Sequence, residues 1–203
     1  MSQTIVNTVK TRIRRHGPGW CFTSKHFLDL NSDTGVRTAL SRLAQDKVIR
    51  RLAQGIYDYP VRHDVLGLIP SDLHRVAQAI AEKDGITIQP SGAHAANLIG
   101  ISDHVPGRIV FLTSGTSKKI KIGKSQILFQ NATPKAMAAA GTKEGLVIQA
   151  FKFMKKDNID QAVRGRTLKF LQGQSPKDLS KNLKYAPAWI RSLVFDIMKD
   201  SIQ

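Results

Sequence analysis

Three segments within the first 45 residues carry apolar side chains at helical spacing. The first covers residues 3–16 and ends at a Gly-Pro-Gly turn, which breaks a helix. The second is short and follows Thr23 or Ser24, either of which can cap its first turn. The third follows a polar run over residues 31–33 and has a full apolar stripe, formed by Val36, Ala39, Leu40, Leu43 and Ala44. The pattern predicts three helices in close succession.

Two short runs with strand character follow the third helix. They cover residues 48–52 and 56–59, and the turn between them contains Gly55, which suits a backbone with positive φ. Pro60 ends the second run because proline cannot donate to a strand ladder. Three helices followed by a basic hairpin is the order of a winged helix-turn-helix, so we expect such a domain over residues 1–60.

The remaining chain mixes helical and extended patterns. Residues 61–70, bounded by two prolines, are expected to be a linker. Beyond it, we expect helices over residues 71–83 and 91–98, and strands over residues 86–88, 108–113, 119–122 and 126–129. The last third has helix-start signals at Pro134, Thr142 and Ser175. The sequence therefore predicts an α+β protein, in which a larger mixed α/β domain over residues 71–203 has a helical C-terminal third.

Composition places the chain among soluble globular proteins, with 41% apolar and 23% charged residues. No apolar run approaches the roughly 18–20 residues that span a bilayer, and the N-terminus lacks the basic and apolar pattern of a secretory signal. The single cysteine, Cys21, excludes an intramolecular disulfide and cysteine-rich zinc sites. We therefore expect a cytoplasmic protein with no membrane partner.

Charge is the strongest compositional signal. The chain has 31 lysines and arginines against 15 acidic residues, which gives a net charge of +16 and a pI near 10.3. Such a charge concentrates polyanions at the surface and favours fast association with nucleic acid. A basic protein selected for solubility, or one with an acidic protein partner, would show the same excess.

The polar face of the third helix is the first candidate for DNA contact, because such a helix fits the major groove of duplex DNA. Its outward side chains, which can reach base edges or phosphates, are Arg37, Thr38, Ser41 and Arg42. Further candidates lie at the start of the second helix and in the hairpin: Thr23, Ser24, Arg50, Arg51 and Gln54. The alternative is a protein-binding winged helix whose polar face is merely solvated.

A lysine-rich hairpin in the second domain is a possible secondary basic surface. Its lysines are Lys118, Lys119, Lys121 and Lys124, and the alternation with isoleucine puts lysine on the wet face of the strand. They could lie along DNA or meet an acidic protein surface. The alternative is a solvated edge strand that lysine protects from aggregation.

Sequence motifs for catalysis are absent. Gly123-Lys124-Ser125 resembles part of a phosphate-binding loop, but Gly115 lies too far upstream and a strand rather than a helix follows. No Gly-x-Ser-x-Gly elbow occurs, and Asp157 and Asp160 are better explained as solvated side chains. No metal-binding spacing occurs among the histidines, which are His16, His26, His63, His74, His94 and His104. We therefore expect no enzymatic activity, no cofactor and no metal.

Two segments carry a resemblance to a known family. The run 39–43, the run 49–57 and Pro60 resemble the winged helix of AbiEi-family antitoxins. The run 90–100, followed by Val105-Pro106 and the run 112–115, resembles the second domain of the same group. The resemblance covers residues from about 20 to about 130, and the C-terminal segment over 131–203 matches no motif of that family.

This resemblance implies a bacterial toxin–antitoxin system. Members repress their own operon through the winged helix, binding inverted repeats in operator DNA cooperatively, and their larger domain counters a nucleotidyltransferase-like toxin. An antitoxin and autoregulatory transcriptional repressor is thus our expectation for this chain. The charge and element order alone leave open an RNA- or ribosome-associated basic protein, which binding to a specific DNA duplex would distinguish.

Overall fold

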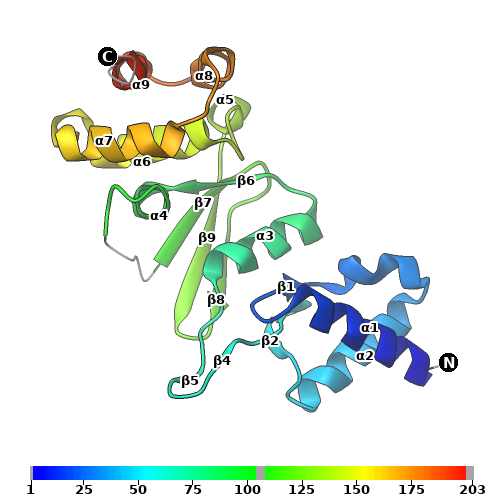
Figure 1. Ribbon diagram of the computed structural model, residues 1–203. Coiled ribbons are helices and arrows are strands. Elements are labelled where there is room, and N and C mark those ends of the chain that lie inside the picture. The colour runs from blue at the N-terminus through cyan, green and yellow to red at the C-terminus, as the bar shows by residue number, and fades with distance from the viewer. Residues whose placement is uncertain (1, 104–107, 200–203) are drawn as a thin grey trace. The chain divides into compact units, whose positions relative to one another are not determined.

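A computed structural model describes residues 2–103 and 108–199 (Figure 1). It contains both helices and strands, and its last third is helical, which confirms the predicted α+β class. His104 and the Val105-Pro106 pair lie outside the described residues. None of the helices in the described part of the chain is both long and apolar enough to cross a bilayer.

The chain divides into two compact units. Unit 1 comprises the chain up to Gly85 together with Ile120–Lys124, and unit 2 comprises Ile86–Lys119 and the chain from Ser125 onward. The sequence pattern predicts that the second domain begins at residue 71. Residues 71–85 instead group with the N-terminal segment. The reason is that α3 (Leu73–Asp84) contacts strands β1 and β3 of unit 1.

The first 60 residues of unit 1 contain helices and a hairpin in the predicted order. Their elements are α1 (Ser2–His16), β1 (Cys21–Phe22), η1 (Ser24–Leu30), α2 (Asp33–Gln45), β2 (Arg50–Ala53) and β3 (Ile56–Asp58). The second helix, η1, is a 3₁₀ helix with a kink at Phe27. Strand β1 was not predicted, because two residues are too few to show an alternating pattern. It pairs antiparallel with β3, and the sheet order is β1-β3-β2.

The core of this segment explains why the helices form where they do. The apolar stripe of α2 is buried as predicted except for Ala44, which is partly buried, and it packs with Val9 and Ile13 of α1 and with Phe22 and Phe27. Trp20 stacks on Phe22 with ring centroids 4.5 Å apart, which extends the core with aromatic contacts. Helix periodicity in the sequence thus corresponds to burial in one shared core.

The expected linker contains a small hairpin. Strands β4 (Arg62–His63) and β5 (Gly67–Leu68) pair antiparallel, and Val65 and Leu66 at its tip are exposed. The chain then enters α3, whose first turn is capped by the carboxylate of Asp72.

Unit 2 combines a sheet with helices. The sheet order is β6-β7-β9-β8, from strands β6 (Ile88–Ser91), β7 (Arg108–Thr113), β8 (Lys118–Ile122) and β9 (Ser125–Asn131). The last three residues of β8 are those that group with unit 1. β6 runs antiparallel to β7, which runs parallel to β9. The helices are α4 (Gly92–Leu98), α5 (Pro134–Met137), α6 (Lys143–Met154), α7 (Gln161–Leu171), α8 (Pro176–Leu183) and α9 (Ala188–Lys199), with a 3₁₀ turn η2 (Lys156–Asn158). α6 packs against α4, α7, α8 and β6, so it is the central helix of this unit.

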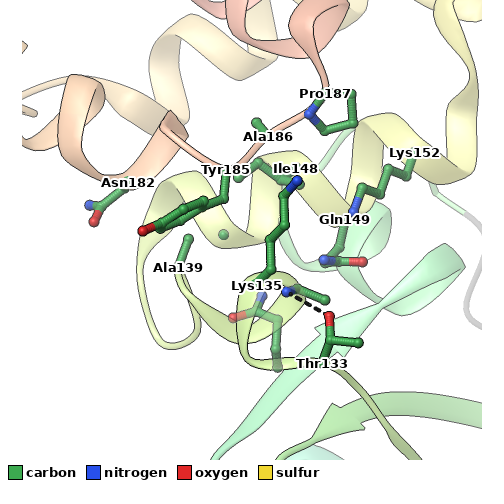
Figure 2. A pocket seen from close by; sticks show the side chains of 13 residues that line it. Thr133, Lys135, Ala139, Ile148, Gln149, Lys152, Asn182, Tyr185, Ala186 and Pro187 are labelled. Carbon is green, nitrogen blue, oxygen red and sulfur yellow. Dashed lines mark hydrogen bonds between the residues drawn. The ribbon is translucent and has the colours of Figure 1, made fainter.

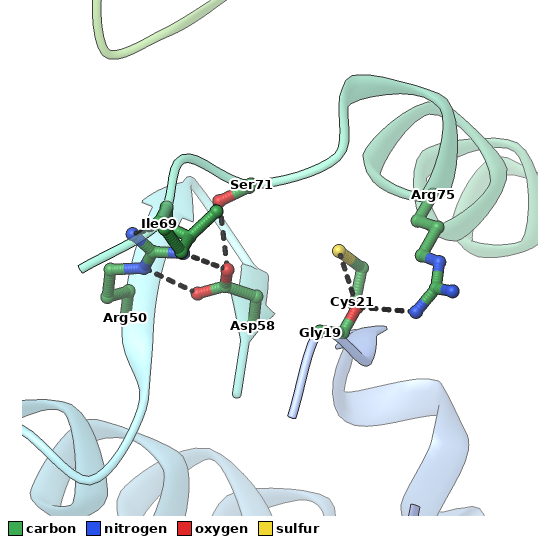
Figure 3. A network of polar contacts seen from close by, with 7 residues as sticks. All are labelled: Gly19, Cys21, Arg50, Asp58, Ile69, Ser71 and Arg75. Atoms are coloured by element: carbon green, nitrogen blue, oxygen red, sulfur yellow. Dashed lines mark hydrogen bonds and ion pairs between the residues drawn. The ribbon is translucent and has the colours of Figure 1, made fainter. Parts of the chain in front are cut away.

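A buried polar network joins β2, β3 and the segment just before α3 in unit 1 (Figure 3). The Asp58 carboxylate accepts hydrogen bonds from Arg50 Nε at 3.0 Å, Arg50 Nη2 at 2.6 Å and Ser71 Oγ at 2.8 Å. Arg50 Nη1 also donates to the carbonyl of Ile69 at 2.9 Å. Because Asp58 is only 1% exposed, its charge is stabilised by these donors rather than by water.

Cys21 lies beside this network and is buried in the core. Burial, and then the nearby carboxylates of Asp58 and Asp72, raise the pKa of its thiol to about 12. Only the thiolate attacks a disulfide reagent. We expect the folded protein not to react with an aromatic disulfide at pH 8, and to release one equivalent of chromophore on addition of guanidinium. Rapid reaction of the native protein would contradict this environment.

Candidate nucleic-acid interface

A groove of 620 Å³ lies on unit 1 between η1, α2, the β2–β3 hairpin and the C-terminal end of α3. The residues that line it are Ser24, Lys25, Leu28, Asp33, Arg37, Leu40, Arg51, Gln54, Gly55, Tyr57 and Lys83. Four of these side chains are basic and one is acidic. The groove is therefore a concave, positively charged surface, which suits a polyanion.

Local backbone features position the groove residues. Thr23 caps η1 through its hydroxyl, which accepts from the backbone N–H of Lys25 at 3.2 Å. Asn31 adopts the left-handed conformation with φ of 50°, so the chain turns sharply before α2. Ser32 then caps α2, and Gly55 closes the hairpin with φ of +70°. The order of helix, turn, helix and hairpin places η1, α2 and the hairpin around one groove.

Asp33, the one acid among the described residues that line the groove, is already paired. Asp33 lies in the first turn of α2 and contacts Arg37 at 2.7 Å, with the two side chains 54% and 70% exposed. A pair this exposed contributes little to stability, so Arg37 can exchange Asp33 for another anion at low cost. The groove thus has three further cations, Lys25, Arg51 and Lys83, and no other acid among its described lining residues.

The groove brings together four of the predicted DNA contacts: Ser24, Arg37, Arg51 and Gln54. Thr38, Ser41 and Arg42 are also exposed on α2 but do not line it. Arg37 and Arg42 are five residues apart, which puts them about 140° apart around the helix axis. Arg42 therefore lies on the opposite flank of the exposed face from Arg37.

Two predicted contact residues have structural roles instead. Thr23 is 1% exposed, so its side chain is inside the fold as the cap of η1 and is not available to DNA. The guanidinium of Arg50 donates hydrogen bonds to the Asp58 carboxylate, the Ile69 carbonyl and the Ser71 hydroxyl. Successive residues of a strand point to opposite faces, so Arg50 points into the fold while Arg51 is exposed on the groove side.

Sequence reasoning missed two basic residues of the groove, Lys25 and Lys83. Lys25 directly follows the predicted contact Ser24, so its place in the first turn of η1 was a usable signal. Lys83 had no such signal, because it lies on a helix assigned to the other domain. In the structure, Lys83 Nζ donates to the carbonyl of Gln54 at 3.4 Å, which brings the end of α3 to the hairpin.

The predicted lysine hairpin does not line this groove. Lys119, Lys121 and Lys124 are exposed, while Lys118 is half-buried with its ammonium 5.1 Å from the centre of the Phe129 ring. A cation over an aromatic face is a local stabilising contact. A role of these four lysines on DNA or on a protein partner stays a prediction.

The described residues contain no group of three or more histidine, cysteine, aspartate or glutamate side chains placed to hold a metal ion. The groove is lined mainly by cations, polar side chains and the exposed Leu28.

Comparison with known proteins finds one family and a distant structural likeness. The family of unknown function DUF6088 matches residues 8–179. The crystal structure of the RV2827C protein from Mycobacterium tuberculosis has 15% sequence identity and a TM-score of 0.46, over 95% of this chain and 81% of that chain. No curated protein matches the chain in sequence.

Proposed function

We propose that this chain, which belongs to the DUF6088 family of unknown function, is a cytoplasmic DNA-binding antitoxin that represses its own operon. The basic groove of unit 1 carries the DNA-binding part, because it joins Arg37 of α2 to Arg51 of the hairpin and to Lys25 and Lys83. In this proposal unit 1 acts as a winged helix, with α2 as the recognition helix and the β2–β3 hairpin as the wing.

In this proposal, side chains of α2 contact the bases, and basic side chains of the hairpin and α3 contact the phosphates. Thr38 and Ser41 occupy the exposed face of α2, where a helix in the major groove reaches base edges. Arg37 lies at the groove side of that face and reads a base or a nearby phosphate. Arg51 and Lys83, at the far side of the groove, contact phosphates and fix the position of the duplex.

The antitoxin part of the proposal rests on the resemblance of residues from about 20 to about 130 to AbiEi-family antitoxins. On that basis the partners are operator DNA with inverted repeats and a nucleotidyltransferase-like toxin. The net charge of +16 supports binding to nucleic acid in general. Duplex DNA is favoured over RNA because a recognition helix fits the wide major groove of B-form DNA, whereas the major groove of A-form RNA is too narrow for side chains to read.

The first test is binding to the DNA upstream of the gene that encodes this chain. Arg37→Ala is expected to weaken binding to that duplex by about 1–3 kcal/mol, which is the range for one arginine contact to a base pair. Fluorescence anisotropy with the upstream duplex, a scrambled duplex and a double-stranded RNA of equal length measures the effect.

Arg191→Ala is the matched control, because Arg191 is an exposed arginine on α9 in unit 2. It removes the same charge and should leave DNA affinity nearly unchanged. Equal losses for Arg37→Ala and Arg191→Ala would mean that only net charge matters. Tighter binding to RNA than to the upstream duplex would favour the RNA-associated alternative.

The antitoxin part has a separate test in cells. Co-expression with a nucleotidyltransferase-like toxin encoded beside this chain should restore growth, and Arg37→Ala should still restore it because the variant affects only DNA binding. Absence of rescue by the wild-type chain would overturn the antitoxin assignment and leave the DNA-binding assignment standing.

A further inference from the structure

Unit 2 contains a cavity of 310 Å³ between α5, α6 and the segment that joins α8 to α9 (Figure 2). Its base is formed by Gln89 of β6 and by one face of α6, on which Gly145, Gln149 and Lys152 recur at helical spacing. Tyr185 and Asn182 line the opposite wall. The volume lies at the lower end of the range for small-molecule sites, about 300–1,000 Å³.

The charge of this cavity is entirely positive. Lys135 of α5 and Lys152 of α6 both line it, and none of its described lining residues is acidic. Figure 2 shows the two lysine side chains reaching toward the same space from different helices. An anion that enters this space is attracted by both ammonium groups.

The amide of Gln149 supplies a hydrogen-bond donor to the cavity. This side chain lines the cavity and the residue is only 6% exposed. Its carbonyl oxygen is 3.5 Å from Ser91 Oγ, and its NH₂ group has no hydrogen-bond partner among the described residues. Among the described residues, the buried side-chain polar atom that lacks a partner is Glu144 Oε1, so the Gln149 NH₂ group is accessible from the cavity. It is therefore a donor available to a molecule in the cavity.

The remaining wall supplies orientation and apolar surface. Asn182 donates from Nδ2 to the buried carboxylate of Glu144 at 2.9 Å, which holds the Asn182 side chain in place. Ile148, Pro187 and the half-exposed ring of Tyr185 offer apolar surface for a flat group. The cavity thus has a cationic end, fixed amides and an apolar side.

We propose that this cavity binds a small organic phosphate, of the size and chemistry of a nucleoside monophosphate. Lys135 and Lys152 bind the phosphate through charge-assisted hydrogen bonds. The amides of Gln149 and Asn182 contact polar edges of the organic part, and the Tyr185 side of the cavity covers its ring. This site is in unit 2 and is independent of the DNA-binding groove.

Calorimetric titration of the full-length protein with adenosine 5′-monophosphate, at constant ionic strength, tests the proposal. Saturable binding at one site per chain is expected, with weaker binding of inorganic phosphate and of adenosine. The double variant Lys135→Gln, Lys152→Gln should lose about tenfold in affinity per lysine, which corresponds to one charge-assisted hydrogen bond each. Both lysines are exposed, so the variant is expected to keep the wild-type melting temperature.

Lys156→Gln is the control, because Lys156 is an exposed lysine of η2 that does not line the cavity. A loss of affinity as large in Lys156→Gln as in a single cavity variant would overturn the proposal, since the general positive field would then explain binding. Unchanged affinity in the double variant would overturn it as well. So would tight binding of a short glutamate-rich peptide at this site without binding of the nucleotide.

Discussion

Arg50→Ala is expected to lower the free energy of unfolding of unit 1 by about 3 kcal/mol, the lower end of the range for breaking a buried ion pair. The substitution removes two of the three side-chain hydrogen bonds to Asp58, which is 1% exposed. Only the bond from Ser71 then stabilises a buried carboxylate. The lower end applies because the Arg50 side chain is itself 27% exposed. Urea unfolding followed by Trp20 fluorescence, in a Trp189→Phe background, measures unit 1 alone.

Arg51→Ala is the matched control for this experiment. Arg51 is the next residue on the same strand and is exposed at the groove. We expect a change in stability within about 0.5 kcal/mol, as for most surface substitutions. Arg51→Ala should instead weaken DNA binding, and by a similar amount for the upstream and the scrambled duplex, because a phosphate contact does not depend on base sequence. If both alanine variants lost the same stability and the same affinity, the two arginines would not have the separate roles assigned to them.

Gly145→Ala is expected to destabilise unit 2 by about 3 kcal/mol, in the upper range for overpacking. Gly145 is buried in the first turn of α6, where a Cβ atom would come within van der Waals overlap of the Ala139 carbonyl, and within 3.2 Å of Gln89 Oε1. The first neighbour is backbone and cannot rotate away. Urea unfolding followed by Trp189 fluorescence, in a Trp20→Phe background, reports on unit 2.

Gly165→Ala, in the same unit, is expected to raise stability rather than lower it. Gly165 lies within α7, is exposed, and has nothing within 4 Å of the position of an added Cβ. Alanine is a better helix former than glycine, so stability should rise by about 0.5–1 kcal/mol. A loss of stability in Gly165→Ala, or none in Gly145→Ala, would show that the packing around α6 differs from that described.

The buried stripes of the helices were predictable because helical periodicity is a local property of the sequence. The stripe of α2, including Val36, Leu40 and Leu43, is buried in unit 1 as its spacing indicated. Ser32 and Thr142, at sequence positions typical of caps, both cap helices. These features depend on residues three or four positions apart, so no knowledge of the tertiary fold is needed to find them.

The division of roles between neighbouring basic residues was not predictable. Arg50 and Arg51 are identical in type and adjacent in sequence, and the sequence offers no sign that one of them pairs with Asp58. Only the pairing of β2 with β3, which places Arg50 opposite Asp58, decides which arginine is inside. Thr23 was likewise predicted as a contact residue. Its burial depends on the core that forms around it, which the sequence does not show.

For this protein, the sequence by itself determined the α+β class, the helices of the first 45 residues, the hairpin after them and the strong positive charge. The tertiary structure decided that α3 belongs to unit 1, that Lys83 reaches the hairpin, and that Arg50 is committed to Asp58. It also brought Lys135 and Lys152 to one cavity. The physical reason is the sequence distance over which each property is set. Helix formation depends on residues a few positions apart and net charge on composition alone, whereas a groove or cavity requires side chains that folding brings together from distant positions.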